Sequence, residues 1–555
     1  MKRFRCCLGL LAGAAVLSAC AIPARQSSAA AQDADLARAE LALARGECRA
    51  AAETYTAAAD RSVDVSLARR ALEVAVRCEH WPARARAAAR WRILAPEDPE
   101  ALRAAAAAAL GQHRITAATE TLRALFALPG EGVDDRFSEL ASTMVDDADA
   151  YPAFTALRMA APLERFSAGS LVGLGRLGFE AYDFARAREL ANQALGRDPG
   201  FAAAYALLAR VYATGSDDVP ALEAAHAALR LDASGQRFVL ADTLTTLGRV
   251  EEAGSELERL QADESASEEA RRRLALLAFE WGDLDVAQRR FLERLERGEG
   301  GGEALYYLAL IAERRKDYGQ SLRAYALLAG AGLGELARPQ AARLLLKQGD
   351  RAAAMSMLDE YVVGHPESAV TFTIAKAQML AEIGEAAEGA AIVDAALGQY
   401  PDHPRLSYEH AVLLERAGST REAIRALGRL ADAHPENTTA LNALGYTLAD
   451  HGRELPRAEA LIRRALAATP DHPAVLDSLG WVRFRRGDTP QARRMLERAY
   501  LISGDPEIAA HWGEVLWSVG ERTEARRVWA QALARHPDAD ALSKVLERLA
   551  PADPQ

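Results

Sequence analysis

Apolar side chains recur at helical spacing along most of this chain. The stretch "VLDSLGWVRFRRGD" (475–488) is typical, because its apolar residues fall on one face of a predicted helix: Leu476, Leu479, Val482 and Phe484. Gly480 lies in the middle of that helix, where a glycine costs about 1 kcal/mol relative to alanine. Either the glycine is a tolerated accident, or another part of the chain must come very close to its backbone.

Small residues recur in phase with Gly480. Steps of 32 to 35 residues reach a glycine or an alanine every time: Gly513 downstream, and Gly445, Ala411, Ala377, Ala342, Ala309, Ala275, Ala241 and Ala209 upstream. A second small residue follows each of these, and Gly480 itself, after 12 or 13 residues: Ala525, Ala492, Ala458, Ala423, Gly389, Ala354, Ser321, Ala287, Ala253 and Ala221. This register predicts two helices per unit that cross at short distance where both side chains are small.

Prolines and glycines keep the same period. The prolines that end units are Pro199, Pro366, Pro401, Pro435, Pro470 and Pro537. Between the two small residues of a unit come turn sequences such as "RRGD" (485–488) and "KQGD" (347–350), in which glycine stops the first helix. Each unit is therefore predicted to contain a helix, a tight turn and a second helix.

This pattern resembles the tetratricopeptide repeat, a unit of about 34 residues with two antiparallel helices. The resemblance is strongest from Phe201 to Pro537, where "LNALGYTLAD" (441–450) and "LDSLGWVRFRRGD" (476–488) resemble the last repeats of a group of bacterial repeat lipoproteins. It implies an all-α fold, an α-solenoid in which the repeats form a superhelix. We expect the repeat array at 166–537 and a capping helix with a tail at 538–555.

The same period continues toward the N-terminus with weaker signals. It places unit ends near four residues: Pro162, Pro129, Pro96 and Val63. These units are rich in alanine and lack the Leu-Gly pair, so we interpret 33–165 as degenerate helical repeats. The stretch 130–170 is the least regular and is expected to form a joint.

The N-terminus is typical of a lipoprotein leader. A basic start precedes an apolar run from Cys6 to Val16, which is too short for a spanning helix and predicts a signal peptide at 1–19. The following "LSAC" resembles the bacterial lipobox and implies lipidation of Cys20; ordinary cleavage without a lipid is the alternative. Residues 20–32 are expected to tether the folded part. Ala21, in place of an aspartate, implies the periplasmic face of the outer membrane.

The charge of the chain argues against nucleic acid as a partner. The formal net charge is −11, and removal of the three basic residues of the leader leaves −14. An acidic surface repels phosphate backbones. We therefore expect protein partners, and contact with the membrane through the lipid anchor.

Two cysteines remain after the leader, Cys48 and Cys78. The repeat register places Cys48 near the start of one second helix and Cys78 near the end of the next first helix. Those two helices are adjacent and antiparallel in such a stack. We favour a disulfide between the two cysteines in an oxidising periplasm, with two separate buried thiols as the alternative.

Motifs that carry catalysis or bind cofactors are missing from the sequence. It contains no GxxxxGK[ST], GxSxG or HExxH and no CxxC after the leader, and the glycine run "GEGGGE" (298–303) follows no predicted strand. The eleven histidines are scattered, and three of them precede unit-ending prolines: His365, His434 and His536. We expect no enzyme, no cofactor and no metal, and a hidden catalytic domain at 130–200 has little support.

A stack of such repeats exposes a groove that is lined mainly by first helices and suits another polypeptide. In the C-terminal units we expect a partner to meet the residues that flank the packed stripe: Asn442, Tyr446, Asp477, Trp481, Arg485, Glu514 and Trp517. Tryptophan, tyrosine and arginine often anchor interfaces. The alternative is that Trp481 and Trp517 pack against the neighbouring unit.

The favoured function is that of a non-catalytic adaptor that is anchored to the outer membrane and gathers periplasmic proteins. Some members of the lipoprotein group that this chain resembles bind a periplasmic carboxyl-terminal processing protease and present cell-wall hydrolases to it. The resemblance implies the same partners here. The alternative is a structural scaffold in an envelope machine, as in exopolysaccharide export or pilus assembly.

Overall fold

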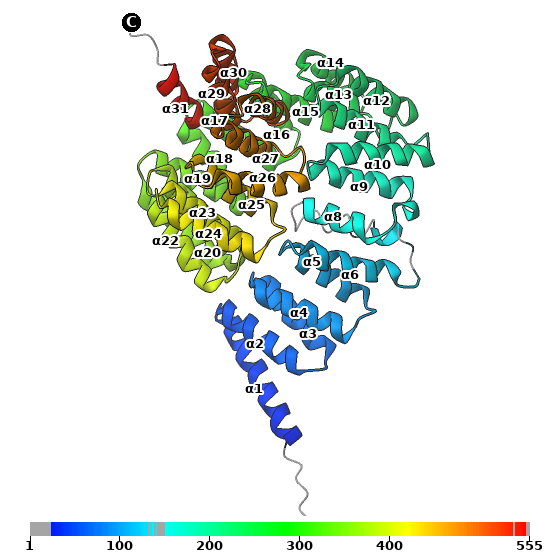
Figure 1. Cartoon of the computed structure of the whole chain (residues 1–555), viewed down its shortest axis with the longest axis vertical. Helices are drawn as coiled ribbons and strands as arrows, with labels where there is room; N and C mark the ends of the chain where they lie inside the picture. Colours follow the sequence, from blue (N-terminus) through cyan, green and yellow to red (C-terminus); the bar gives the residue numbers. More distant parts are fainter. Residues whose placement is uncertain are drawn as a thin grey trace, which may run out of the picture.

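The computed structural model describes residues 24–130, 132, 134–137, 140, 150–536 and 539–550. Within these residues all regular structure is helical and no strand occurs, so the all-α solenoid prediction is confirmed. The helices follow one coiled path from α1 (Ala24–Ala44, blue) to α31 (Asp540–Leu549, red) in Figure 1. The predicted signal peptide, Cys20, Pro537 and the last five residues lie outside the described residues.

Consecutive helices pair into units with a first and a second helix. The N-terminal pairs are α1 with α2 (Cys48–Arg61), α3 (Val65–Arg77) with α4 (Trp81–Leu94), and α5 (Pro99–Leu110) with α6 (Ile115–Ala127). A further second helix, α8 (Ala150–Ala160), and the short 3-10 helix η1 (Leu163–Arg165) complete this part.

The regular units continue from residue 168 to the C-terminal cap. Their pairs are α9 (Ala168–Glu180) with α10 (Phe184–Arg197), α11 (Ala202–Thr214) with α12 (Asp218–Leu231), α13 (Val239–Thr246) with α14 (Val250–Gln261), α15 (Ser267–Glu280) with α16 (Leu284–Glu296), α17 (Gly301–Arg314) with α18 (Tyr318–Gly330), and α19 (Gly334–Lys347) with α20 (Arg351–Gly364). After the 3-10 helix η2 (Pro366–Ser368) come α21 (Ala369–Glu382) with α22 (Ala386–Gln399), α23 (Pro404–Arg416) with α24 (Thr420–Ala433), α25 (Thr438–Asp450) with α26 (Leu455–Ala468), α27 (Pro473–Arg485) with α28 (Thr489–Ser503), and α29 (Pro506–Ser518) with α30 (Arg522–Arg535).

The periodic small residues lie where the two helices of a unit cross. All twenty of them are buried. A Cβ atom added to Gly480 would lie 2.7 Å from Cγ of Leu496 and 3.3 Å from the backbone oxygen of Ala492, both in the second helix of the same unit. A Cβ atom on Gly389 would lie 2.6 Å from the backbone oxygen of Ala377. Gly480 is therefore favoured by the close approach of the second helix, which places the Leu496 side chain and the Ala492 backbone against it.

First helices of neighbouring units pack on one another along three stretches, from α9 to α13, from α19 to α23 and from α25 to α31. Among the described helices, second helices of neighbouring units make comparable contacts in the N-terminal part, between α2 and α4 and between α6 and α8. In the regular units, where such contacts lie between first helices, the coil therefore curves toward the first helices. In each first helix, the residue that directly follows the small crossing residue marks one side of the helix. We call this side of the first helices the inner surface. Arg210, Tyr446 and Trp481 belong to it.

Paired helices also occupy the N-terminal part, where the sequence signal is weak. The second helices end at Arg61, Leu94, Ala127 and Ala160, each two residues before a predicted unit end. Residues 24–32, expected as part of a tether, are instead the first turns of α1. Part of the expected joint, residues 141–149, lies outside the described residues.

A disulfide joins the first two units. Cys48 is the first residue of α2, Cys78 directly follows α3, and their Cα atoms are 5.2 Å apart. In the chain-entropy view, a disulfide that closes a loop of this length adds about 3–4 kcal/mol of stability. The linkage therefore strengthens the end of the array where apolar side chains are smallest.

The other end of the array carries the expected cap. Helix α31 packs on α29 and buries Leu542 and Val545, which covers the last first helix of the stack. Repeat arrays need such a terminal helix because the last unit has no following neighbour. Along the described part of the chain, none of the helices combines the length and apolarity that crossing a bilayer would take.

Replacement of Gly480 by leucine tests the close crossing. The larger side chain collides with Leu496, so we expect a loss of about 1–3 kcal/mol in the free energy of unfolding. Gly428 is the matched control, because it lies within α24 with open space around it. There leucine improves helix propensity, and Gly428→Leu is expected to stabilise by about 0.5–1 kcal/mol. Equal melting temperatures for Gly480→Leu and the wild type would contradict the packing account.

Candidate protein-binding surface

The C-terminal part of the inner surface is built by α25, α27 and α29. Tyr446, Trp481 and Glu514 are equivalent residues in these helices, because each directly follows the glycine at the helix crossing. The close crossings bring the three helices side by side, and the side chains of one reach the next. The predicted binding residues are therefore brought together, although several of them serve contacts between units.

Trp481 is only 7% exposed and packs between units. Its ring stacks on the imidazole of His511 in the next unit, with centroids 4.5 Å apart and 22° between the planes. Its Nε1 donates a hydrogen bond to Oδ1 of Asp450 in the preceding unit (3.2 Å). The sequence left two roles open for Trp481, contact with a partner and packing against the neighbouring unit. In the structure Trp481 packs against the neighbouring units.

Asp477 and His511 form a salt bridge between α27 and α29. Nδ1 of His511 lies 2.8 and 3.0 Å from the two carboxylate oxygens of Asp477, which is 6% exposed. Burial lowers the pKa of His511, but the charge and hydrogen bond of Asp477 more than offset this and, with Glu507 and Glu514 nearby, raise the pKa to about 9. The imidazole therefore carries a positive charge at neutral pH.

Three further predicted residues keep some exposure on this surface. Arg485 is exposed, and its Nη1 donates to the backbone oxygen of Asp450 (2.8 Å). Asn442 and Tyr446 are half-buried, and burial raises the pKa of the Tyr446 hydroxyl. Arg485 is thus the side chain that a partner could reach most easily.

The last two predicted residues contact the end of the array. Glu514 accepts a bond from Arg548 of the capping helix (2.5 Å). Trp517 is half-buried, and its ring lies 5.7 Å from that of Trp529 in the second helix of its own unit. Packing within the same unit was not one of the roles considered for Trp517. Neither side chain is free to serve binding alone.

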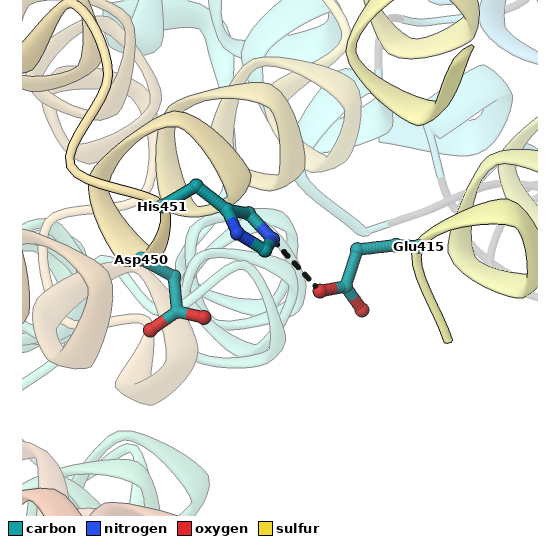
Figure 2. Close-up of side chains that lie close together, drawn as sticks. All are labelled: Glu415, Asp450 and His451. Atoms are coloured by element: carbon teal, nitrogen blue, oxygen red, sulfur yellow. Dashed lines mark hydrogen bonds and ion pairs between the residues drawn. The ribbon is translucent and has the colours of Figure 1, made fainter. Parts of the chain in front are cut away.

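Glu415, Asp450 and His451 come together at the ends of α23 and α25, a cluster that no sequence motif indicated. In Figure 2, His451 points toward Glu415, and its Nε2 lies 3.3 Å from the carboxylate, while Asp450 bonds to neither. One ligand atom from each residue lies within 4.8 Å of the others, a set that could hold a divalent cation. Asp450 is already bound by Trp481, and the pair of Glu415 and His451 is an ordinary surface contact.

Arginine side chains gather on the inner surface between α9 and α15. The guanidinium of Arg210 stacks 4.0 Å from the ring of Phe179, and that of Arg273 lies 4.3 Å from Phe238; each stack joins neighbouring first helices. Together with exposed Arg176 they line a cavity of about 510 Å³ beside the short helix α13. Three arginines from neighbouring first helices therefore lie close together on this part of the inner surface.

Sequence reasoning missed His511, the residue that organises the C-terminal cluster. It lies two residues before Gly513, off the register at which groove residues were expected. Its role depends on Asp477 and Trp481, which come from another unit. The one available signal was an imidazole and a carboxylate spaced by one repeat, 34 residues apart.

The salt bridge of His511 makes stability depend on pH. The folded pKa of about 9 exceeds the ordinary histidine value, so the stabilisation is complete below about pH 6.5 and is lost as the pH rises through 9. We expect His511→Gln to lower the free energy of unfolding by on the order of 1–3 kcal/mol at pH 6.5 and by less at pH 9.5. His226→Gln, at an exposed position, is the control for melting curves at both pH values. A pH-independent effect of His511→Gln would rule out the charged pair.

Comparisons with known proteins agree with the helical repeats. The tetratricopeptide repeat family matches residues 340–404 and 408–473. The chain is also 34% identical over 212 residues to the TPR repeat-containing protein PA4667 of Pseudomonas aeruginosa. That match spans 38% of this chain and 36% of the length of the relative.

Solved structures with similar repeats match at low TM-scores. PilW, a widely conserved type IV pilus biogenesis factor, is 18% identical and matches over 38% of this chain and 98% of its own, with a TM-score of 0.30. The Cut9–Hcn1 structure is 14% identical over 95% of this chain and 98% of that one, with a TM-score of 0.32. These scores are too low to carry an argument. On the repeat match and the helical pairs, the chain contains tetratricopeptide repeats and has the fold of an α-solenoid.

Proposed function

We propose that this protein is a non-catalytic scaffold that binds other proteins along its inner surface. Tetratricopeptide repeats, the family that matches residues 340–404 and 408–473, are generally non-catalytic scaffolds for protein–protein interactions. The observation that carries the proposal is the packing of first helices on one another along three stretches of the array, from α9 to α13, from α19 to α23 and from α25 to α31. Such a surface suits an extended or folded polypeptide.

The second part of the proposal is an anchor at the outer membrane. The leader and the lipobox-like "LSAC" support acylation of Cys20, and three acyl chains exceed what stable anchoring requires. The folded array begins a few residues later, with α1 at Ala24. A lipid at Cys20 therefore holds the scaffold close to the membrane surface, on its periplasmic side.

The third part concerns the partners. The resemblance of 441–450 and 476–488 to repeat lipoproteins supports an adaptor that binds a periplasmic carboxyl-terminal processing protease and brings cell-wall hydrolases to it. The disulfide between Cys48 and Cys78 is compatible with that oxidising compartment. A scaffold in an exopolysaccharide or pilus machine is the alternative that the binding experiment separates.

Capture of partners from detergent-solubilised envelope tests the binding surface. We expect the wild-type array to retain a protease and cell-wall hydrolases, and Arg485→Glu to lose on the order of tenfold in capture because it reverses an exposed charge on the inner surface. Arg494→Glu makes the same change on the exposed side of the second helix α28 and should bind normally. Retention of export or pilus components would favour the alternative, and equal binding by both variants would exclude the inner surface.

Replacement of Cys20 by serine tests the anchor. The variant cannot be acylated, so we expect it to move from the membrane fraction to the soluble periplasmic fraction. Intact mass of the purified wild-type protein should include the lipid. A wild-type protein that is soluble and carries no lipid would refute the anchor while leaving the scaffold function open.

A further inference from the structure

Turns far apart in the sequence meet where the array coils past its own beginning. In Figure 1, the helices from α22 to α26 lie beside helices of the first third of the chain. Three turns, each between the two helices of an early unit, contact three turns that connect late units. One further bond between early and late units joins Nη1 of Arg49, at the start of α2, to the backbone oxygen of Gly398 in α22 (2.5 Å). One hydrogen bond from each of the three turn contacts joins residues that are 324, 322 and 287 positions apart in the sequence. These contacts are therefore separate from the packing between neighbouring repeats.

The first contact is made by His403, which precedes α23 and is 2% exposed. Its Nε2 lies 2.9 Å from the carboxylate of Glu79, in the turn between α3 and α4. The ring of Trp81 meets the imidazole edge-on, with centroids 5.8 Å apart. A polar bond and an aromatic contact thus fix the same histidine.

The second contact caps a helix from a distance. Helix α6 begins after Arg114, whose side chain makes no capping bond. The carboxylate of Glu436 takes that role, because it accepts the backbone N–H of Ile115 at 2.7 Å and lies 3.3 Å from the hydroxyl of Thr116. A carboxylate at a helix N-terminus is favoured by the exposed N–H groups and by the helix dipole. Nδ1 of His434 adds a bond to the backbone oxygen of Gln112 (2.9 Å).

The third contact repeats the same arrangement at α10. Asp471, 2% exposed, accepts the backbone N–H of Phe184 through Oδ2 (3.1 Å). The backbone N–H of Asp471 donates to the oxygen of Tyr182 at 2.8 Å. The ring of Tyr182 also packs on the imidazole of His472, with centroids 4.6 Å apart. Two hydrogen bonds and one aromatic contact therefore join these turns.

These contacts differ in kind from those inside the units. Neighbouring helices are held by buried alanine, leucine and valine side chains. The three contacts instead consist of hydrogen bonds, one of them between an imidazole and a carboxylate, and two aromatic contacts at turns. When such a contact opens, its polar groups form hydrogen bonds to water in place of the bonds to each other, so the net cost in free energy is small. The three contacts can open while every helix pair stays packed, and solenoids bend by small changes at each interface.

From this geometry we infer that the three contacts form a clasp, made by His403, Glu436 and Asp471, that closes the coil on itself and opens reversibly as one unit. Release of the clasp lets the array extend like a spring. Because the first helices face the inside of the coil, extension also changes the width of the inner surface.

The chain provides its own control for the clasp. The tripeptide His-Pro-Glu occurs at 365–367 and again at 434–436, each time in the turn after a second helix. Glu436 reaches α6, whereas Glu367 is exposed and His365 stacks on Tyr361 four residues before it. Identical substitutions at the two glutamates therefore separate the clasp from any local effect of the turn.

Hydrogen exchange at single amides reports the clasp directly. The N–H groups of Ile115 and Phe184 are at the first positions of their helices, where no intrahelical acceptor exists, so their protection depends on Glu436 and Asp471. We expect Glu436→Ala to speed exchange at Phe184 and Asp471, in the other contact, on the order of tenfold, because the clasp opens as a unit. Glu367→Ala should leave these amides unchanged.

Solution X-ray scattering of the full chain gives the second readout. The variant His403→Ala/Glu436→Ala/Asp471→Ala should have a larger maximum dimension than the wild type, with the same helical circular dichroism. A scattering curve equal to that of the wild type would overturn the clasp. Faster exchange confined to Ile115 in Glu436→Ala would show three separate contacts and would overturn the joint opening.

Discussion

The close crossing of two helices at a pair of small side chains is the contact on which the rest of this structure depends. At Gly480 and Ala492 the crossing leaves no room for even one added methyl group. Because the same pair recurs in every regular unit, each unit has nearly the same shape and stacks on its neighbours in the same way. A repeated small rotation between identical units produces a coil.

The crossing also decides which side chains are available for function. It draws the first helices together, so that side chains beside the small residues reach into the next unit, as Trp481 does toward His511. Large aromatic and charged residues on the inner surface therefore hold the stack together as well as facing its interior. A partner would meet mainly the exposed ends of such side chains, of which Arg485 is the clearest.

The fold could be predicted from the sequence because its main cause is local. A period of small residues, glycine stops and prolines is visible in one dimension, and it located helix ends even in the alanine-rich N-terminal part. The site could be predicted only in part. The salt bridge of Asp477 with His511 and the capping of α6 by Glu436 join residues whose contact depends on coil geometry, which no single unit encodes.

A double-mutant cycle between Gly480 and Leu496 tests the crossing most directly. The free energy of unfolding is measured for the wild type, Gly480→Ala, Leu496→Ala and the double variant. If the added Cβ collides with Leu496, Gly480→Ala lowers the free energy of unfolding in the wild-type background. In the Leu496→Ala background this loss is expected to be smaller by at least about 1 kcal/mol. An equal cost of Gly480→Ala in both backgrounds would contradict a crossing that requires glycine.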